Sequence, residues 1–393
     1  MEKKLYLDYN STTPCDPLVV DAMLPHFNNE FGNTSSIHHS YGWIAKEALD
    51  TATMKIANTL NIKADNIIYT SGATEGINMI LKSFCKKFKP AGSHIITCKT
   101  EHKAVLDTLA FMEAYEGISV TYLDVDESGL VNLDELKAAL RPETILVAIM
   151  YANNETGVIQ PLKEIAKIIA NQDIFLFSDA TQALGKVDLK IVFDNADFTC
   201  FSAHKVYGPK GVGIVYCKNK GASKVLKGLI QGGAQQKGWR GGTINTPGIV
   251  GFAKAIELCY QNFEEENIRM TRLRDQLEAG LLDIDLSHCN GHSAPRLPNT
   301  TNISFSFANG AGLLRALSKD MAVSNGSACN SASENPSHVL EAMQIDSELA
   351  LSSLRFSLGK HNTEKDIFET IKIVRKQVHL LRESNILWER RKR

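Results

Sequence analysis

Short apolar runs alternate with helix-period segments through much of this chain, and no other feature limits its fold so strongly. Between about residues 50 and 260 these runs are Asn66–Thr70, His94–Thr97, Ser119–Leu123, Thr144–Tyr151, Ile174–Ser178, Phe198–Phe201 and Gly213–Cys217. Strands that alternate with helices form an α/β sheet whose strands are mostly parallel. Functional side chains in such sheets collect at the carboxyl ends of the strands. We therefore expect the site at the ends of these runs.

The chain is long enough for two domains, and its sequence pattern changes once, near residue 260. It has 393 residues, of which 44% are hydrophobic, so it can bury a large core. A long charged amphipathic helix is expected at Phe263–Leu282, and residues 387–393 are expected to form a loose tail. We predict a large domain at residues 16–260 and a small α+β domain at residues 261–393 together with residues 1–15.

Charge and cysteine content exclude several classes of protein. Lys and Arg (43) nearly balance Asp and Glu (44), so nucleic acid is a poor default partner. The eight cysteines include no C-x-x-C pair and no zinc-ligand spacing, which favours free thiols in a reducing cytoplasm. No charged stretch leads into an apolar run near Met1, and no apolar run reaches eighteen residues, so we expect neither secretion nor a membrane span. We expect a cytoplasmic protein.

Two charged residues stand at neighbouring strand ends. Lys205 follows an apolar run and precedes a Gly-rich stretch, which would project its amine into a cleft, although most lysines are solvated surface charges. Asp179 follows the preceding run and could hold a protonated pyridine nitrogen, which makes a cofactor ring a better electron sink. A helix cap or a turn is the plain alternative for such an aspartate.

A phosphate-binding turn is expected at Ser71–Gly76, which reads SGATEG. A strand, a turn of small residues and a helix start follow one another here, and the amide groups at a helix N-terminus suit a phosphate dianion. The segment could equally be an ordinary helix cap. Because the chain has no G-x-G-x-x-G after a strand and no G-x-x-x-x-G-K-[ST], the phosphate would belong to a cofactor other than a dinucleotide or nucleoside triphosphate.

The chain resembles class I cysteine desulfurases of the NifS/IscS group, which are fold-type I pyridoxal-phosphate enzymes with the aspartate-aminotransferase-like fold. The resemblance runs from Leu5 to about Trp388. It rests on several motifs in the same order: YLDYNSTTP at Tyr6–Pro14, SGATE at Ser71–Glu75, TEHKAVLD at Thr100–Asp107, NNETG at Asn153–Gly157, DATQ at Asp179–Gln182, HKVYGPKG at His204–Gly211, SNGSACNSAS at Ser324–Ser333 and SLRFSLG at Ser353–Gly359.

The resemblance implies a role for each matching residue. Lys205 would bind the cofactor covalently and move the substrate Cα proton, and His102 would stack on the cofactor ring and act on the substrate thiol. Arg355 and Asn33 would bind the substrate carboxylate. Thr243 would reach the site of the partner subunit in a homodimer. The implied contacts to pyridoxal 5'-phosphate are Ala73, Thr74, His102, Asn154, Asp179, Gln182, Ser202, His204, Lys205 and Thr243.

Cys329 stands apart from the other cysteines because of its neighbours. Residues 324–333 contain small and polar residues and no large apolar one, which is typical of an exposed loop. A nucleophilic thiolate needs such a setting, whereas most cysteines are small core residues. The resemblance makes Cys329 the residue that receives sulfur from L-cysteine as a persulfide, with alanine as the other product.

Other functions remain open from the sequence alone. A selenocysteine lyase would share nearly all of these residues. An aminotransferase of the same fold has no use for Cys329. A catalytically silent sulfur-relay or scaffold-binding protein would not need Lys205, Asp179 or His102. For a desulfurase, the partner would be a sulfur acceptor, either an iron–sulfur scaffold or a relay for thiolation of tRNA, DNA or another carrier.

Overall fold

A seven-stranded sheet forms the larger part of the molecule in the computed structural model, which describes residues 4–88, 92–218, 220–325 and 335–391. The strand order is β2-β8-β7-β6-β5-β3-β4. Strand β8 runs antiparallel to β2 and β7, and the other neighbours are parallel, so the predicted α/β class is confirmed. The strands are β2 (Ile67–Thr70), β3 (His94–Cys98), β4 (Ser119–Leu123), β5 (Thr144–Ala148), β6 (Phe175–Asp179), β7 (Phe198–Ser202) and β8 (Gly213–Cys217).

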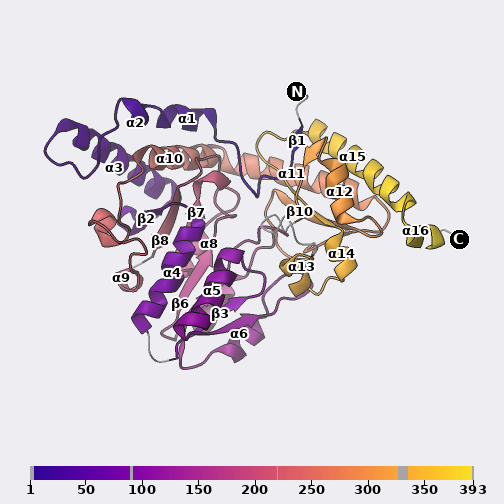
Figure 1. Ribbon diagram of the computed structural model, residues 1–393, viewed down its shortest axis with the longest axis horizontal. Helices are drawn as coiled ribbons and strands as arrows, with labels where there is room; N and C mark the ends of the chain where they lie inside the picture. Colours follow the sequence, from indigo (N-terminus) through magenta and orange to yellow (C-terminus); the bar gives the residue numbers. More distant parts are fainter. Residues whose placement is uncertain (1–3, 89–91, 219, 326–334, 392–393) are drawn as a thin grey trace.

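Helices cover both faces of this sheet (Figure 1). One face packs against α4 (Ala73–Phe88) and α5 (Lys103–Glu116), whose apolar residues share a core with the strands. The opposite face packs against helices that share the other large core, which are α3 (Ser40–Leu60), α6 (Leu133–Ala139), α7 (Leu162–Ile169), α8 (Lys190–Asn195) and α10 (Thr246–Gln261). Burial on both faces explains why the strands are nearly continuous apolar runs.

A second, smaller part has its own sheet and core. Strand β10 (Thr300–Phe305) pairs antiparallel with β9 (Ser287–Cys289) and β12 (Ser353–Ser357). The helices α11 (Phe263–Leu282), α12 (Gly310–Leu317) and α15 (Glu364–Glu383) contribute to this core. Because α10 belongs to the large core and α11 to the small one, we propose that the two domains divide near residue 260, as the sequence predicts.

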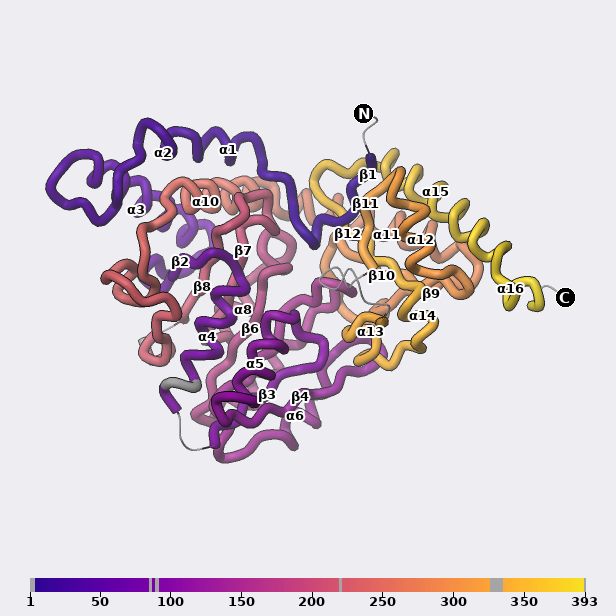
Figure 2. The backbone as a smooth tube through the Cα atoms, in the orientation of Figure 1, coloured from indigo at the N-terminus to yellow at the C-terminus, as the bar shows by residue number. Residues whose placement is uncertain are grey.

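The N-terminal segment belongs to both parts. Strand β1 (Leu5–Tyr6) pairs in parallel with β11 (Met321–Ala322) in the small part, and Leu7 is in the small core. The chain then crosses to α1 (Pro17–Met23) and α2 (Pro25–Asn28), which pack against α10 of the large part (Figure 2). Residues 8–16 therefore run between the two parts. The remaining elements are η1 (Ala64–Asn66), η2 (Ala203–Lys205), α9 (Lys220–Ser223), η3 (Gln235–Gly238), α13 (His338–Ala342), α14 (Ser347–Leu351) and α16 (Ile386–Arg391).

The C-terminal tail corrects one expectation. Residues 386–391 form α16 and are not a loose end, because Trp388 packs against Phe307, with ring centroids 5.7 Å apart, and against the guanidinium of Arg382. The helix before it, α15, begins with a capping box formed by Thr363 and Asp366. Among the described residues, none of the helices has the length and apolar character needed to cross a membrane.

Candidate active site

A cavity of about 600 Å³ opens at the carboxyl ends of β6 and β7. Ten of the residues that the sequence singles out line it: Ala73, Thr74, His102, Asn154, Asp179, Gln182, Ser202, His204, Lys205 and Arg355. They come from segments far apart in the chain, and the strand ends bring them together as the α/β topology requires.

The ends of two neighbouring strands place the central amine and carboxylate. Strand β6 ends at Asp179, and β7 ends at Ser202 and continues into η2, which ends at Lys205. The carboxylate of Asp179 is 7% exposed, and its Oδ1 accepts a hydrogen bond from the Thr181 amide at 2.9 Å. The Lys205 amine donates to the carbonyls of residues 10 and 11, at 2.5 and 2.8 Å.

His102 caps the N-terminus of α5 and lines the same cavity. Its Nδ1 accepts a hydrogen bond from the Ala104 amide at 3.1 Å, which places the ring proton of the neutral imidazole on Nε2. Burial lowers the pKa of His102, although the Asp179 carboxylate opposes this shift. The ring is therefore neutral at pH 7, and such a ring can take up or release one proton during a reaction.

The first turn of α4 lines the cavity with Ala73, Thr74 and Glu75. The backbone amides of this turn have no acceptor within the helix. Gly72, just before the helix, packs closely on Gly213, because a Cβ on Gly213 would lie 2.6 Å from the Gly72 Cα. Across the cavity, burial and the nearby charges of Lys205, Lys210 and Lys186 lower the pKa of His204 to about 4. This concentration of positive charge beside a helix N-terminus suits a phosphate dianion.

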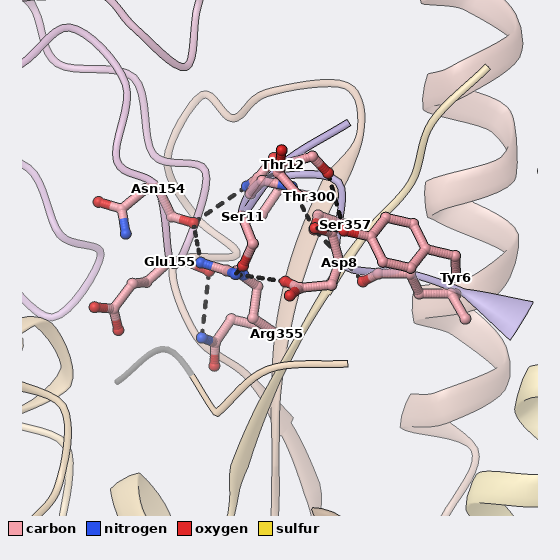
Figure 3. A network of polar contacts seen from close by, with 12 residues as sticks. Tyr6, Asp8, Ser11, Thr12, Asn154, Glu155, Thr300, Arg355 and Ser357 are labelled. Carbon is pink, nitrogen blue, oxygen red and sulfur yellow. Dashed lines mark hydrogen bonds and ion pairs between the residues drawn. The ribbon is translucent and has the colours of Figure 1, made fainter. Parts of the chain in front are cut away.

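Arg355 is held by the N-terminal segment (Figure 3). It is 3% exposed, and its Nη2 donates to Asp8 at 2.6 Å and to Ser11 at 3.0 Å, while Nη1 donates to the Asn154 carbonyl at 3.0 Å. Its buried Nε has no hydrogen-bond partner among the described residues. A buried cation with an unused donor is suited to bind an anionic substrate group.

A second amine, that of Lys186, is connected to the site by hydrogen bonds. Lys186 donates to the side-chain oxygen of Gln182 at 3.2 Å, and Gln182 donates to the Asn10 carbonyl at 3.0 Å. That carbonyl also accepts from Lys205. Burial and, to a smaller extent, the charge of Lys205 lower the pKa of Lys186 to about 7. Lys186 and Lys205 thus belong to one connected network.

The sequence did not assign roles to the residues that the N-terminal segment brings to the cavity. Asn10, Ser11 and Thr12 line it, and the Asn10 side-chain Nδ2 donates to the Asn154 carbonyl at 3.1 Å and to the Thr300 hydroxyl at 2.9 Å. The available signal was the polar YLDYNSTTP stretch, which matches the resembled family but has no local feature that shows where it lies.

Two residues singled out in the sequence are described by the structure and do not line the cavity of this chain. Asn33 is exposed, and its Oδ1 accepts a hydrogen bond from the Ser35 amide at 2.9 Å. Thr243 is also exposed, and neither residue is among those that line the cavity. The predicted grouping of Asn33 with Arg355 is therefore not formed within one chain. Cys329 lies outside the described residues.

The donor set fits pyridoxal phosphate. An amine can bind the carbonyl of this cofactor, a buried carboxylate can hold its pyridine nitrogen, and a positively charged helix N-terminus can hold its phosphate. Lys205, Asp179 and the first turn of α4 supply these groups around one cavity. The fold and the site define an α/β enzyme that depends on pyridoxal phosphate.

Comparison with known proteins places the chain more closely. It belongs to the aminotransferase class-V family, whose model matches residues 5–369. It is 43% identical over 390 residues to a protein of Anaeromyxobacter dehalogenans (strain 2CP-C) named cysteine desulfurase IscS, covering 99% of this chain and 96% of that one. The predicted family and cofactor are thereby confirmed.

Solved structures give the same result. A NifS-like protein is 36% identical and superposes with a TM-score of 0.87, covering 96% of this chain and all of that one (100%). A structure described as SspA in complex with cysteine is 34% identical, with a TM-score of 0.79, and covers 92% of this chain and 100% of the other. At these identities the likeness extends to the fold of nearly the whole chain.

Proposed function

We propose that this protein is a cysteine desulfurase, which converts L-cysteine to L-alanine and leaves the sulfur on Cys329 as a persulfide. One observation carries the proposal: Lys205, His102 and Arg355 meet in a single cavity that fits pyridoxal phosphate. The near full-length likeness to proteins named cysteine desulfurase supports the choice of substrate.

The residues around the cavity divide the work of the reaction. When bound, pyridoxal phosphate supplies an electron sink that acidifies the Cα–H bond of an amino acid. Asp179 would keep the pyridine nitrogen protonated, and the Arg355 guanidinium, which lines the cavity, would bind the substrate carboxylate. The Lys205 amine would take the proton from Cα, since a general base must lie within reach of the proton it moves.

Sulfur transfer needs one thiolate and two placed protons. The neutral His102 ring would take the proton of the substrate thiol or return it. The Cys329 thiolate then attacks the substrate sulfur, so that an S–S bond forms while the C–S bond breaks. The electron pair of the broken bond stays with the substrate Cβ, which takes up a proton to give alanine.

A homodimer is the second part of the proposal. Many large apolar side chains of the segment from α1 to α3 are exposed, which are Leu18, Val20, Leu24, Phe27, Phe31, Ile37, Tyr41, Trp43, Ile44 and Met54. A patch of this kind marks an interaction surface, and we propose that a second copy of the chain covers it. Asn33 lies within this patch, and Thr243 would reach the cavity of the partner subunit.

The sulfur acceptor would be another protein. A persulfide on Cys329 must pass its outer sulfur to a second thiol, so the partner would be an iron–sulfur scaffold or a thiolation relay that presents a cysteine. Among the described residues, the cysteines at positions 15, 98, 200, 217, 259 and 289 form no disulfide, which supports a cytoplasmic setting, where thiols stay reduced.

The test is a product analysis of the holoenzyme with L-cysteine. We expect alanine in a one-to-one ratio with the sulfur released or bound, and loss of alanine formation in Cys329→Ser but not in Cys289→Ser. Wild-type protein that binds pyridoxal phosphate and forms no alanine from L-cysteine would overturn the proposal. Turnover of L-selenocysteine alone would assign the protein as a selenocysteine lyase instead.

A further inference from the structure

The Gln182 side chain, which lines the cavity that fits pyridoxal phosphate, is held by a neighbouring lysine. Residues 181–186 form a series of turns after β6, in which the Leu184 amide donates to the Ala180 carbonyl at 3.3 Å. Residues four positions apart are neighbours in such turns. The Lys186 amine therefore reaches Gln182, and it donates to the Gln182 backbone carbonyl at 3.0 Å and to its side-chain oxygen at 3.2 Å.

Two neighbours decide which way round the Gln182 amide lies. An ammonium group can only donate hydrogen bonds, and a carbonyl oxygen can only accept them. The Lys186 amine therefore fixes the amide oxygen on its own side, and the Asn10 carbonyl, which accepts from Gln182 Nε2 at 3.0 Å, fixes the nitrogen. Because the amide nitrogen carries two N–H groups, one N–H remains for a group bound in the cavity.

Lys186 is not among the residues that line this cavity. It lines a second cavity, of about 220 Å³, which shares Lys205 with the first. Burial lowers the pKa of Lys186 to about 7, the charges of Lys205 and Arg355 act in the same direction, and the Cys259 thiol of α10 opposes them. Even when neutral, the amine keeps two N–H groups for the two oxygens of Gln182. A buried amine costs free energy, so its place next to Gln182 favours a role beyond packing.

We propose that Lys186 is a positioning residue, which fixes the Gln182 amide so that an N–H, and not the oxygen, is offered to the phenolic oxygen of bound pyridoxal phosphate. Such a donor withdraws charge from the phenolic oxygen, which then attracts a proton on the cofactor less strongly. Lys186 touches neither the cofactor nor the substrate in this account. The inference needs the bound cofactor and no particular substrate, so it does not depend on the proposed function.

The experiment is a pH titration of cofactor absorbance in the holoenzyme without substrate. The protonated and unprotonated forms of the bound cofactor absorb at different wavelengths, so the titration gives an apparent pKa. Gln182→Met removes the donor and should raise this pKa by about 1. Lys186→Met leaves the amide oxygen without its partner and should raise the pKa by at least about 0.5. Lys186→Arg keeps donors for that oxygen and should titrate as wild type does.

Two further variants separate positioning from the effect of charge alone. If Lys186 acts through Gln182, the double variant Lys186→Met with Gln182→Met should titrate as Gln182→Met alone does. Lys360→Met is the matched control, because Lys360 also lines the second cavity and has an ion pair with Asp16, and among the described residues it has no hydrogen bond to Gln182. This control should leave the apparent pKa of the cofactor unchanged.

Several results would overturn the proposal. They are a wild-type titration in Lys186→Met, shifts that add in the double variant, and a shift in Lys360→Met as large as that in Lys186→Met. Circular dichroism shows whether each variant folds. If Lys186→Met does not retain the cofactor, Lys186→Arg decides, since it must bind the cofactor and titrate as wild type does, and a raised pKa in this variant would contradict the account. A wild type that forms no alanine from L-cysteine would remove the proposed function and leave this inference standing.

Discussion

The cavity and the surface of α1 to α3 break the usual distribution of residues in opposite ways. Around the cavity, charged side chains are buried, and Arg355 and Asp179 are only 3% and 7% exposed. On the segment from α1 to α3, apolar side chains are exposed, and Phe27, Ile37 and Trp43 are 62%, 70% and 58% exposed. A single chain would be more stable without either feature.

The difference shows in which region the side chains find their partners within the same chain. The buried charges have partners within the chain, as Arg355 has in Asp8 and Ser11, and as Lys186 has in Gln182. Such buried polar groups are expected at a site that performs chemistry. The exposed apolar residues are instead those that another protein surface would cover. Each prediction below tests one side of this contrast.

The largest effect is expected for the amine at the centre of the cavity. Lys205→Ala removes the base that we assign to the Cα proton, so alanine formation should fall at least about 1000-fold. The rate is measured with L-cysteine and saturating pyridoxal phosphate. Lys46→Ala is the control, because it removes only an exposed ion pair with Asp50 on α3, and it should keep the full rate. A Lys205→Ala protein with wild-type turnover would contradict the assignment.

The next effect concerns the buried guanidinium. Arg355→Met removes charge-assisted hydrogen bonds to the substrate carboxylate. If these bonds contribute about 3 kcal/mol, their loss should lower kcat/KM about 100-fold. Arg355→Lys keeps the charge without the planar guanidinium, so its kcat/KM should lie between those of wild type and Arg355→Met. Steady-state kinetics with L-cysteine give the values. A kcat/KM that does not depend on this residue would mean that the carboxylate binds elsewhere.

A smaller effect is expected on the apolar surface. Ile37→Glu combined with Trp43→Glu places two charges in the proposed dimer contact, which should shift the mass in solution from two chains to one. Activity at low protein concentration should then fall about tenfold, because Thr243 would no longer reach the partner's cavity. Light scattering after gel filtration gives the mass. Phe368→Glu, at a position on α15 that is 67% exposed, is the matched control and should leave the mass unchanged.

The smallest effect is a dependence of stability on pH. Burial lowers the pKa of Lys186 to about 7, so between pH 7 and its ordinary pKa of 10.5 the unfolded chain binds a proton that the folded chain lacks. This residue therefore makes the fold more stable as pH rises through that window. Lys186→Met lacks this dependence. The free energy of unfolding of the variant minus that of wild type should therefore decrease by about 1–2 kcal/mol from pH 7 to pH 9. Urea unfolding at both pH values measures this difference. A difference that increases with pH would contradict the account.

The sequence predicts the sheet well where one strand has clear ends. β4 and β8 match the expected runs Ser119–Leu123 and Gly213–Cys217, because β-branched and aromatic residues stop at glycine or charged neighbours. The run Thr144–Tyr151 was too long, since β5 ends at Ala148. The amides of residues 149 and 151 still donate to carbonyls of residues 177 and 179, so the chain continues beside β6 as an apolar segment outside the strand.

Local sequence pattern predicted the site only where it follows a strand, and the family resemblance supplied other residues of the cavity, such as His102 and Arg355. Asp179 and Ser202 end β6 and β7, and local pattern is enough to place them. Asn10 was missed because its position depends on contacts with Asn154 and Thr300, which are distant in sequence. The helix α16 was missed for the same reason, since a short polar helix is stable only through its packing on the rest of the fold.

The most direct test of the whole account follows one sulfur atom. Holoenzyme receives a single equivalent of sulfur-35-labelled L-cysteine, and its peptides are separated without reductant and counted. Label on the peptide that bears Cys329 in the wild type, and no label there in Lys205→Ala, is the predicted result, because both residues would serve one bound cofactor. Label on that peptide in both proteins, or on other cysteine peptides in the wild type, would contradict it.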